Sequence, residues 1–180
     1  MTAVAGIAQD GCVWIGADTA GTGGGYGQTV RSDGKVFRNG PMVMGFTSSY
    51  RMGQLLRHTL VVPKQYDEPT DTYMVGTFMD AVRTCLKTGG YAKKDNEVES
   101  GGTFLIGYDG RLFTIGDDYQ VGESAAGYDA VGCGDHLALG SLFTSTGKPK
   151  ARILTALKAA EAMSAGVRGP FEIVKTKEPS

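Results

Sequence analysis

The sequence has few cysteines, no excess of charge of one sign and no long apolar run. Its 3 cysteines, Cys12, Cys85 and Cys133, are scattered and form no Cys-x-x-Cys pair, which argues against a disulfide framework or a zinc site and fits a reducing compartment. The 18 basic and 19 acidic residues are mixed along the chain and leave a net charge of -1. This balance supports neither nucleic acid nor an anionic membrane as a partner.

The sequence also lacks targeting and cofactor signals. A membrane-spanning helix needs roughly 18 consecutive apolar residues, and no stretch reaches that length. The N-terminal residues lack the basic flank and apolar stretch of a signal peptide, so we expect a cytoplasmic protein. No phosphate-binding loop, cofactor motif or metal-ligand cluster is present, and we expect neither cofactor nor metal. No linker or internal repeat divides the chain, so we expect a single domain over residues 1–180.

Glycine is abundant instead, with 28 residues, about twice the average usage. The glycines lie between apolar runs, often as Asp-Gly or Asn-Gly pairs, which predict tight hairpin turns. The predicted strands cover residues 3–7, 12–17, 35–37, 42–46, 103–107, 111–115 and 170–175, with a further pair of extended runs that ends at the sequence AVGCGDH. We expect residues 21–34 to form an irregular loop or a ragged extended segment, and residues 91–100 to form a solvated loop.

Apolar residues at helical spacing predict helices in four places. The predicted helices run from Ser48 to Leu60, around Met74 to Cys85, from Gly134 onward, and from Pro149 to Ala165. The order is therefore strands, two helices, strands, two helices, strand. This order predicts an α+β protein with two mostly antiparallel sheets packed together and helices on both outer faces.

The opening TAVAGIAQDGCVWIGADTAGT resembles the N-terminus of proteasome β subunits and of the bacterial peptidase HslV, which are N-terminal nucleophile (Ntn) hydrolases. Such proteins share an N-terminal threonine, an aspartate after the second strand, a later lysine and a Gly-Ser-Gly turn before a late helix. These positions are held here by Thr2, Asp18 in GADTAGT, Lys35 in DGKVF and Cys133 in GCG. The resemblance spans nearly the whole chain and implies the four-layer αββα sandwich of the Ntn hydrolases.

The resemblance implies that Thr2 is the nucleophile. A threonine hydroxyl is a poor nucleophile without an adjacent base, and a terminal threonine supplies that base as its own α-amine. Removal of Met1 by a methionine aminopeptidase would expose Thr2, so we expect no longer leader to be needed. The reference pKa of an α-amine is about 7.7 to 8.0, so the amine needs a nearby ammonium to stay neutral. The resemblance assigns that ammonium to Lys35 and assigns Asp18 to hold it in place.

The resemblance also assigns the substrate contacts. Alignment of GFTSS with the Gly-Phe-Ala-Gly-Gly of the family makes the backbone N–H of Ser48 the oxyanion donor, and Thr22 matches a threonine that lines the cleft. Four positions depart from the family: Ser48 stands in place of glycine, Cys133 of serine, Ala165 of aspartate and Ala20 of arginine. None of these changes removes the nucleophile, the amine or the lysine.

Three functions remain open on the sequence. The first is a threonine peptidase that forms a homo-oligomeric ring, cuts unfolded polypeptide inside its chamber and receives folded substrates from a separate ATPase. The second is an Ntn hydrolase of small amides, although such enzymes are generally longer. The third is a catalytically silent ring subunit, which retention of Met1 would favour. The sequence GCGDH superficially suggests a cysteine nucleophile with His136, but we interpret both residues as structural.

Overall fold

The computed structural model describes residues 1–23 and 27–176, and two antiparallel sheets form its centre. The first sheet consists of β1 (Val4–Gln9), β2 (Cys12–Asp18), β12 (Tyr128–Val131) and β13 (Phe171–Lys175), in the order β12-β1-β2-β13. The second consists of β5 (Val36–Asn39), β6 (Met42–Phe46), β9 (Phe104–Tyr108), β10 (Arg111–Ile115) and β11 (Val121–Glu123), in the order β11-β10-β9-β6-β5. Two separate hairpins pair β3 (Ala20–Gly23) with β4 (Gly27–Val30), and β7 (Lys93–Asp95) with β8 (Val98–Ser100).

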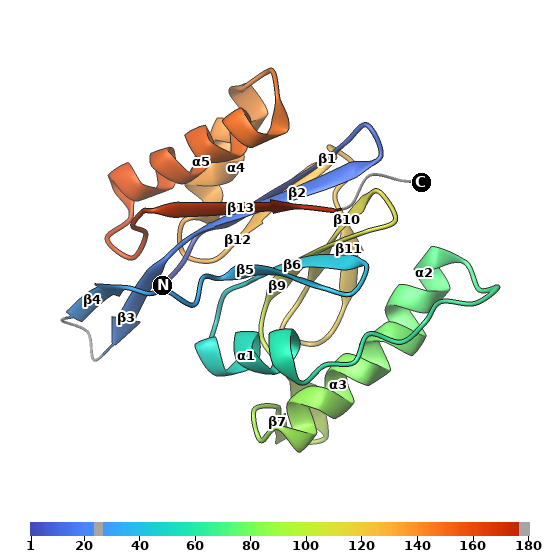
Figure 1. Ribbon diagram of the computed structural model, residues 1–180. Coiled ribbons are helices and arrows are strands. Elements are labelled where there is room, and N and C mark those ends of the chain that lie inside the picture. The colour runs from blue at the N-terminus through green and yellow to red at the C-terminus, as the bar shows by residue number, and fades with distance from the viewer. Residues whose placement is uncertain (24–26, 177–180) are drawn as a thin grey trace.

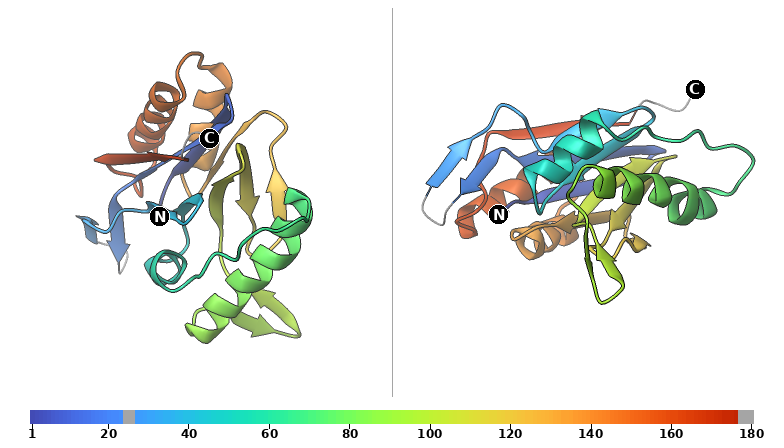
Figure 2. Two further views of the ribbon diagram at one scale, coloured as in Figure 1. Left: turned by 45° about the vertical axis from the view of Figure 1, so that its right-hand side comes forward. Right: turned by 90° about the horizontal axis from the view of Figure 1, so that it is seen from below.

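The helices form two groups on opposite sides of the paired sheets (Figures 1 and 2). One group contains α1 (Tyr50–His58), α2 (Thr70–Tyr73), the π-helical turn η1 (Met74–Phe78) and α3 (Met79–Thr88). The other contains α4 (Asp135–Thr144) and α5 (Pro149–Met163). None of the helices in the described ranges combines the length and the apolar character that a membrane span requires. The expected mixture of antiparallel sheets and helices is confirmed.

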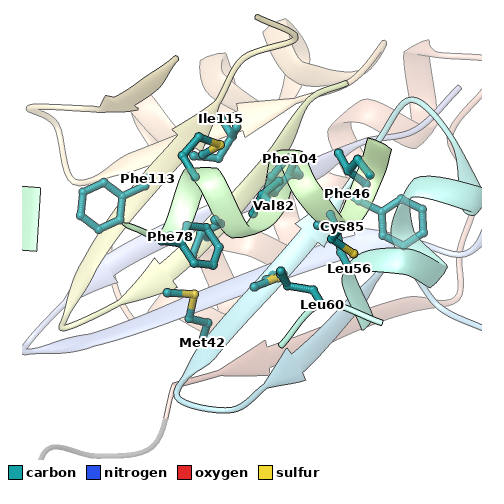
Figure 3. Close-up of a cluster of buried hydrophobic side chains, with 14 of the residues drawn as sticks. Met42, Phe46, Leu56, Leu60, Phe78, Val82, Cys85, Phe104, Phe113 and Ile115 are labelled. Atoms are coloured by element: carbon teal, nitrogen blue, oxygen red, sulfur yellow. The ribbon is translucent and has the colours of Figure 1, made fainter. Parts of the chain in front are cut away.

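Three apolar clusters hold these elements together. One joins the second sheet to α1, η1 and α3, and Figure 3 shows its interdigitated side chains. Another packs α4 and α5 against the first sheet. The third lies between the sheets and is built mainly from branched side chains, namely Val4, Val13, Ile15, Ala17, Val36, Val43, Leu105, Leu112 and Val131. Burial of these clusters is the main favourable term in folding.

Close contact between the sheets requires glycine within the strands. A Cβ atom added to Gly45 of β6 would lie 2.6 Å from Cγ1 of Val4 and 2.7 Å from Cγ2 of Ile15. Such distances are shorter than van der Waals contact, so any larger residue would push the two sheets apart. Part of the glycine excess in the sequence therefore serves sheet packing as well as turns.

The turn predictions succeed where glycine is present and fail in one place where it is absent. Asp10-Gly11 and Asp109-Gly110 connect paired strands with positive φ at both central residues, as predicted. The prediction of a solvated loop at residues 91–100 is wrong, because β7 and β8 form a hairpin there. Asn96 and Glu97 form its turn with φ of 46° and 70°, the same left-handed pattern without a glycine.

Other boundaries differ in detail. For residues 21–34 the sequence left two alternatives, an irregular loop or an extended segment. The described part contains the hairpin of β3 and β4, so the extended segment is the correct alternative there. Residues 24–26 lie outside the described residues. The extended runs at β11 and β12 do not pair with each other, because β11 pairs with β10 and β12 pairs with β1. The first helix ends at His58 and the last at Met163, both before the predicted ends.

Candidate active site

Thr2 lies just before β1, and the N-terminus of the chain lies near β3 and β5 (Figure 1). Thr2 is buried, with 5% of its surface exposed. Its N–H donates to Sγ of Cys133 over 3.2 Å, and its Oγ1 donates to the Met1 carbonyl over 2.5 Å. The loop after β12 approaches so closely that a Cβ on Gly132, where φ is +105°, would lie 2.4 Å from the Thr2 carbonyl oxygen. Thr2 is therefore fixed by the loop that carries Cys133.

Asp18 and Lys35 form a buried ion pair beside Thr2. Asp18 ends β2 in the first sheet and Lys35 precedes β5 in the second, so the pair connects the two sheets. The Lys35 Nζ lies 2.9 Å from Oδ1 and 2.8 Å from Oδ2 of Asp18, and the two side chains are 2% and 0% exposed. The Asp18 carboxylate also accepts the backbone N–H groups of Ala3 and Ala20, at 2.9 and 3.0 Å. These four contacts hold the carboxylate in one orientation.

Lys35 points toward the peptide bond that precedes Thr2. Its Nζ lies 3.4 Å from the Met1 carbonyl oxygen. Burial lowers the pKa of Lys35 below its usual value, and the charge of Asp18 opposes that shift. A buried ammonium held by a carboxylate is the kind of group that shifts the protonation of a neighbouring amine.

A cleft of about 260 Å³ opens at Thr2 and brings together most of the predicted site residues. Its lining includes Thr2, Thr22, Lys35 and Ser48. The Thr22 Oγ1 accepts a hydrogen bond from the Met1 amine over 3.4 Å. Ser48 adopts φ of +66°, a left-handed conformation that glycine adopts more readily, and its Oγ accepts the N–H of Thr103 over 3.1 Å. A side chain at this position is therefore held by a hydrogen bond that glycine would lack.

Cys133 contacts the nucleophile candidate and a residue that the sequence analysis missed. Its Sγ lies 3.5 Å from the Thr2 carbonyl oxygen and 3.5 Å from the Oγ of Ser164. Ser164 follows α5, next to Ala165, and no local pattern signals its contact across 31 positions. The His136 side chain is 95% exposed beside Asp135, and no hydrogen bond joins it to Cys133 within the described part of the chain.

Tyr50 lines the cleft and Arg31 packs on its ring, and both residues were also missed. The Tyr50 hydroxyl donates to the Ala20 carbonyl over 3.3 Å, and the guanidinium carbon of Arg31 lies 3.9 Å from the centre of the Tyr50 ring. Burial raises the pKa of Tyr50 to about 12, so this hydroxyl keeps its proton at neutral pH. An aromatic residue directly after GFTSS was the signal available in the sequence.

Met1 is part of the lining of the cleft, with 60% of its surface exposed. A Cβ on Gly166 would lie 2.1 Å from the Met1 Cβ, so the Met1 side chain lies directly against the backbone after α5. Because Met1 is joined to Thr2, the Thr2 nitrogen is an amide and cannot accept a proton. Within residues 1–23 and 27–176, no cluster of three or more His, Cys, Asp or Glu side chains could hold a metal ion.

Neither a protein-family profile nor a curated protein sequence matches the chain. Solved structures do match. BPH from Thiobacillus denitrificans, solved in complex with epoxomicin, superimposes with a TM-score of 0.79 at 22% identity and covers 99% of this chain and 100% of that chain. Eukaryotic HslV from Trypanosoma brucei gives a TM-score of 0.68 at 15% identity, with coverage of 97% and 98%. Anbu, an ancestral beta-subunit from Yersinia bercovieri, gives 0.68 at 12%, with coverage of 97% and 81%.

The similarity to these structures defines the fold. The chain has the HslV-like, proteasome-like fold of the Ntn hydrolases, which confirms the resemblance at the level of fold. On that fold, Thr2 precedes the first strand beside a buried lysine–carboxylate pair.

Proposed function

We propose that the protein is an N-terminal threonine peptidase that hydrolyses peptide bonds once Met1 is removed. The observation that carries the proposal is the buried Asp18–Lys35 pair, whose ammonium lies 3.4 Å from the carbonyl oxygen that precedes Thr2. A charged pair that is almost fully buried requires a compensating role, and perturbed groups of this kind gather at active sites. Its position beside a buried threonine hydroxyl, on this fold, favours that chemistry.

In the proposed reaction the free amine of Thr2 takes the proton of Oγ1 while Oγ1 forms a bond to the substrate carbonyl carbon. The backbone N–H of Ser48 donates to the developing oxyanion. The intermediate then collapses, the C–N bond breaks, and the amine gives its proton to the departing nitrogen. A water molecule, deprotonated by the same amine, attacks the resulting ester and releases the second product and the free hydroxyl.

The remaining residues keep the amine neutral and oriented. The ammonium of Lys35 disfavours protonation of the amine, and Asp18 holds Lys35 at the correct distance. Cys133 acts on the amine from the other side, since its Sγ already accepts the N–H of Thr2 at 3.2 Å. Thr22 binds the substrate backbone in the space that the Met1 amine now occupies.

The proposal extends to architecture and assembly. We infer a single domain over residues 1–180 in which helices, sheet, sheet and helices form the four-layer αββα sandwich. We further infer a homo-oligomeric ring in the cytoplasm that cuts unfolded polypeptide and works with a separate ATPase. The likeness to HslV and to an ancestral beta-subunit supports this assembly.

One observation favours a second function, that of a catalytically silent ring subunit. Met1 fits closely against Gly166 and its amine bonds to Thr22, so a chain that keeps Met1 has this residue in the lining of the cleft and lacks the catalytic base. The two functions differ in the fate of Met1 alone.

The test uses a chain that begins at Thr2, released from a cleavable N-terminal fusion. We expect this chain to hydrolyse fluorogenic peptides and unfolded casein, Thr2→Ser to retain activity, and Thr2→Ala to lose it. Thr155→Ala, on the exposed side of α5, is the matched control and should behave as the parent chain. Equal activity in Thr2→Ala and the parent chain would refute the proposal.

A further inference from the structure

A second cavity, of about 380 Å³, adjoins the cleft at Thr2. Phe46 and Tyr50 line both cavities, so the two cavities adjoin at these side chains. The rest of its lining comes mainly from α1 and from the segment before β5. A substrate whose carbonyl lies at Thr2 and Ser48 can therefore place a side chain in this second cavity.

The charged groups around this cavity are unbalanced. Arg51, Arg57 and His58 line it, and Asp33 is the single carboxylate among its lining residues. Asp33 already accepts two hydrogen bonds from Arg31, at 2.8 and 2.6 Å. These bonds lower the pKa of Asp33 below its usual value. Asp33 thus pairs chiefly with an arginine outside the lining and interacts with Arg57 through charge alone, so the lining carries two arginines against one carboxylate that is already hydrogen-bonded.

Arg57 is the lining cation whose hydrogen bonds leave it farthest from full satisfaction. Its terminal nitrogen donates only to the backbone carbonyls of Gly34 and Val36, at 2.5 and 3.1 Å, and its guanidinium lies 4.7 Å from the centre of the Phe37 ring. Its Nε is buried and has no hydrogen-bond partner. A buried N–H without an acceptor is unfavourable, and it is most strongly so in a charged group.

Arg51 lies on the exposed side of the same cavity. Its terminal nitrogen donates to the Gly89 carbonyl over 3.0 Å. Within the described ranges, neither Arg51 nor Arg57 forms an ion pair. Arginine has a rigid planar fork of donors that matches a carboxylate, and charge-assisted bonds of this type are roughly twice as strong as neutral ones.

We propose that this second cavity binds the side-chain carboxylate of an aspartate or glutamate, so that the protein cuts preferentially after acidic residues. The acidic residue is the one whose carbonyl Thr2 attacks. Arg51 and Arg57 supply the positive charge, while Phe46 and Tyr50 contact the methylene groups of the side chain. This inference rests on the proposed peptidase function and names the substrate class of that site.

The experiment uses the chain that begins at Thr2 and peptides that differ only in the residue before the fluorophore: Glu, Gln, Leu or Arg. We expect kcat/KM for the Glu peptide to exceed that for its isosteric Gln partner about tenfold or more, which is what a charge-assisted hydrogen bond contributes. The Arg peptide should be cut most slowly. Raised salt should reduce the Glu preference because it screens the attraction.

Variants then identify the side chains that cause the preference for the Glu peptide. Arg57→Met should reduce the Glu to Gln ratio to near one, chiefly by slowing the Glu peptide, and Arg51→Met should reduce it in the same direction. Arg83→Met, in the exposed pairs with Asp80 and Glu99, is the matched control and should leave the ratio unchanged. If Arg57→Met does not fold, Arg51→Met and the substrate panel on the parent chain still decide the question.

The outcomes separate the two proposals. A parent chain that cuts the Gln, Leu or Arg peptide as well as the Glu peptide overturns the acidic preference and leaves the peptidase function standing. A parent chain that cuts no peptide and gains no mass with epoxomicin overturns the peptidase function, and the preference falls with it.

Discussion

The buried Asp18–Lys35 ion pair and an exposed cluster around Arg111 look alike in distance and differ in setting. At one end, Lys35 and Asp18 lie 2.8 Å apart and are 2% and 0% exposed. Elsewhere, Arg111 of β10 pairs with Asp71 at 2.7 Å and with Glu123, and these three side chains are 32%, 73% and 38% exposed. The bond lengths are nearly equal, so the difference between the clusters lies in solvent.

The difference in solvent exposure indicates which of the two sets of ion pairs to associate with function. An exposed pair contributes about 0–1 kcal/mol, because water already solvates both charges. A buried pair must recover a large desolvation cost, and removal of one partner costs about 3–5 kcal/mol because it leaves a buried charge alone. The Arg111 cluster therefore fastens α2 and β11 to β10, whereas the Asp18–Lys35 pair is expected to act on chemistry.

The largest expected effect comes from breaking the buried pair. Lys35→Met leaves the Asp18 carboxylate buried without its cation, so the free energy of unfolding should fall by about 3–5 kcal/mol. Peptide hydrolysis should be lost in the folded fraction, because the Thr2 amine becomes protonated. Urea denaturation and peptide assays measure the two effects, with Lys150→Met on exposed α5 as the control. Full activity in folded Lys35→Met would contradict the role of Lys35.

A rise in pH should change stability and activity in opposite directions. Burial lowers the pKa of Lys35, so the folded chain loses this proton at a lower pH than the unfolded chain, whose lysine keeps a pKa of about 10.4. Between those two values the unfolded state binds more protons, and the contribution of this group to the unfolding free energy rises with pH. Activity should fall in the same interval, because the ammonium beside Thr2 disappears.

The check is a pH–rate profile of the chain that begins at Thr2, together with urea denaturation of that chain and of Lys35→Met. The difference in unfolding free energy between the two should grow as pH rises toward 10.4. An alkaline limb no lower than that value would show that Lys35 does not control the rate.

A smaller effect is expected at the sulfur contact beside Thr2. Cys133→Ala removes the acceptor of the Thr2 N–H, which lies 3.2 Å from Sγ, and should slow hydrolysis about 2- to 10-fold, the value of one hydrogen bond. Cys133→Ser keeps a hydroxyl at this position and should be at least as active as the parent. Steady-state kcat measures both variants. Equal rates in all three chains would assign Cys133 to packing alone.

The smallest effect is expected from the exposed cluster. Arg111→Met should lower the free energy of unfolding by about 1 kcal/mol or less and leave peptide hydrolysis unchanged. Urea denaturation in low and high salt measures it, since salt should already weaken the cluster in the parent chain. A loss as large as that of Lys35→Met would remove the distinction between the two clusters.

The turns and strands were predictable where a local signal exists. Asp10-Gly11 and Asp109-Gly110 adopt the left-handed turn that this pair favours. Asn96 and Glu97 adopt the same turn without glycine. The residues around them are mostly charged and polar, a pattern typical of a loop, so the hairpin of β7 and β8 was not predicted. The partners of β11 and β12 could not be predicted, because strand pairing depends on contacts between distant segments.

The site was predictable only in part. The positions of Thr2, Asp18, Lys35 and Cys133 came from their resemblance to a family, and the structure brings them together. The contact of Cys133 with Ser164 depends on how α5 packs, which no local pattern encodes. The buried Nε of Arg57, which lacks an acceptor, could not be predicted either, because an arginine at helical spacing is usually solvated and the burial of its Nε depends on the fold.

The most direct test of the central claim is the intact mass of the purified protein before and after exposure to epoxomicin, a peptidyl epoxyketone that reacts with the hydroxyl and the free amine of an N-terminal threonine. The proposed function predicts loss of one methionine, then a stoichiometric adduct that Thr2→Ala does not form. A chain that begins at Thr2, folds and gains no adduct would contradict the assignment of Thr2 as the nucleophile.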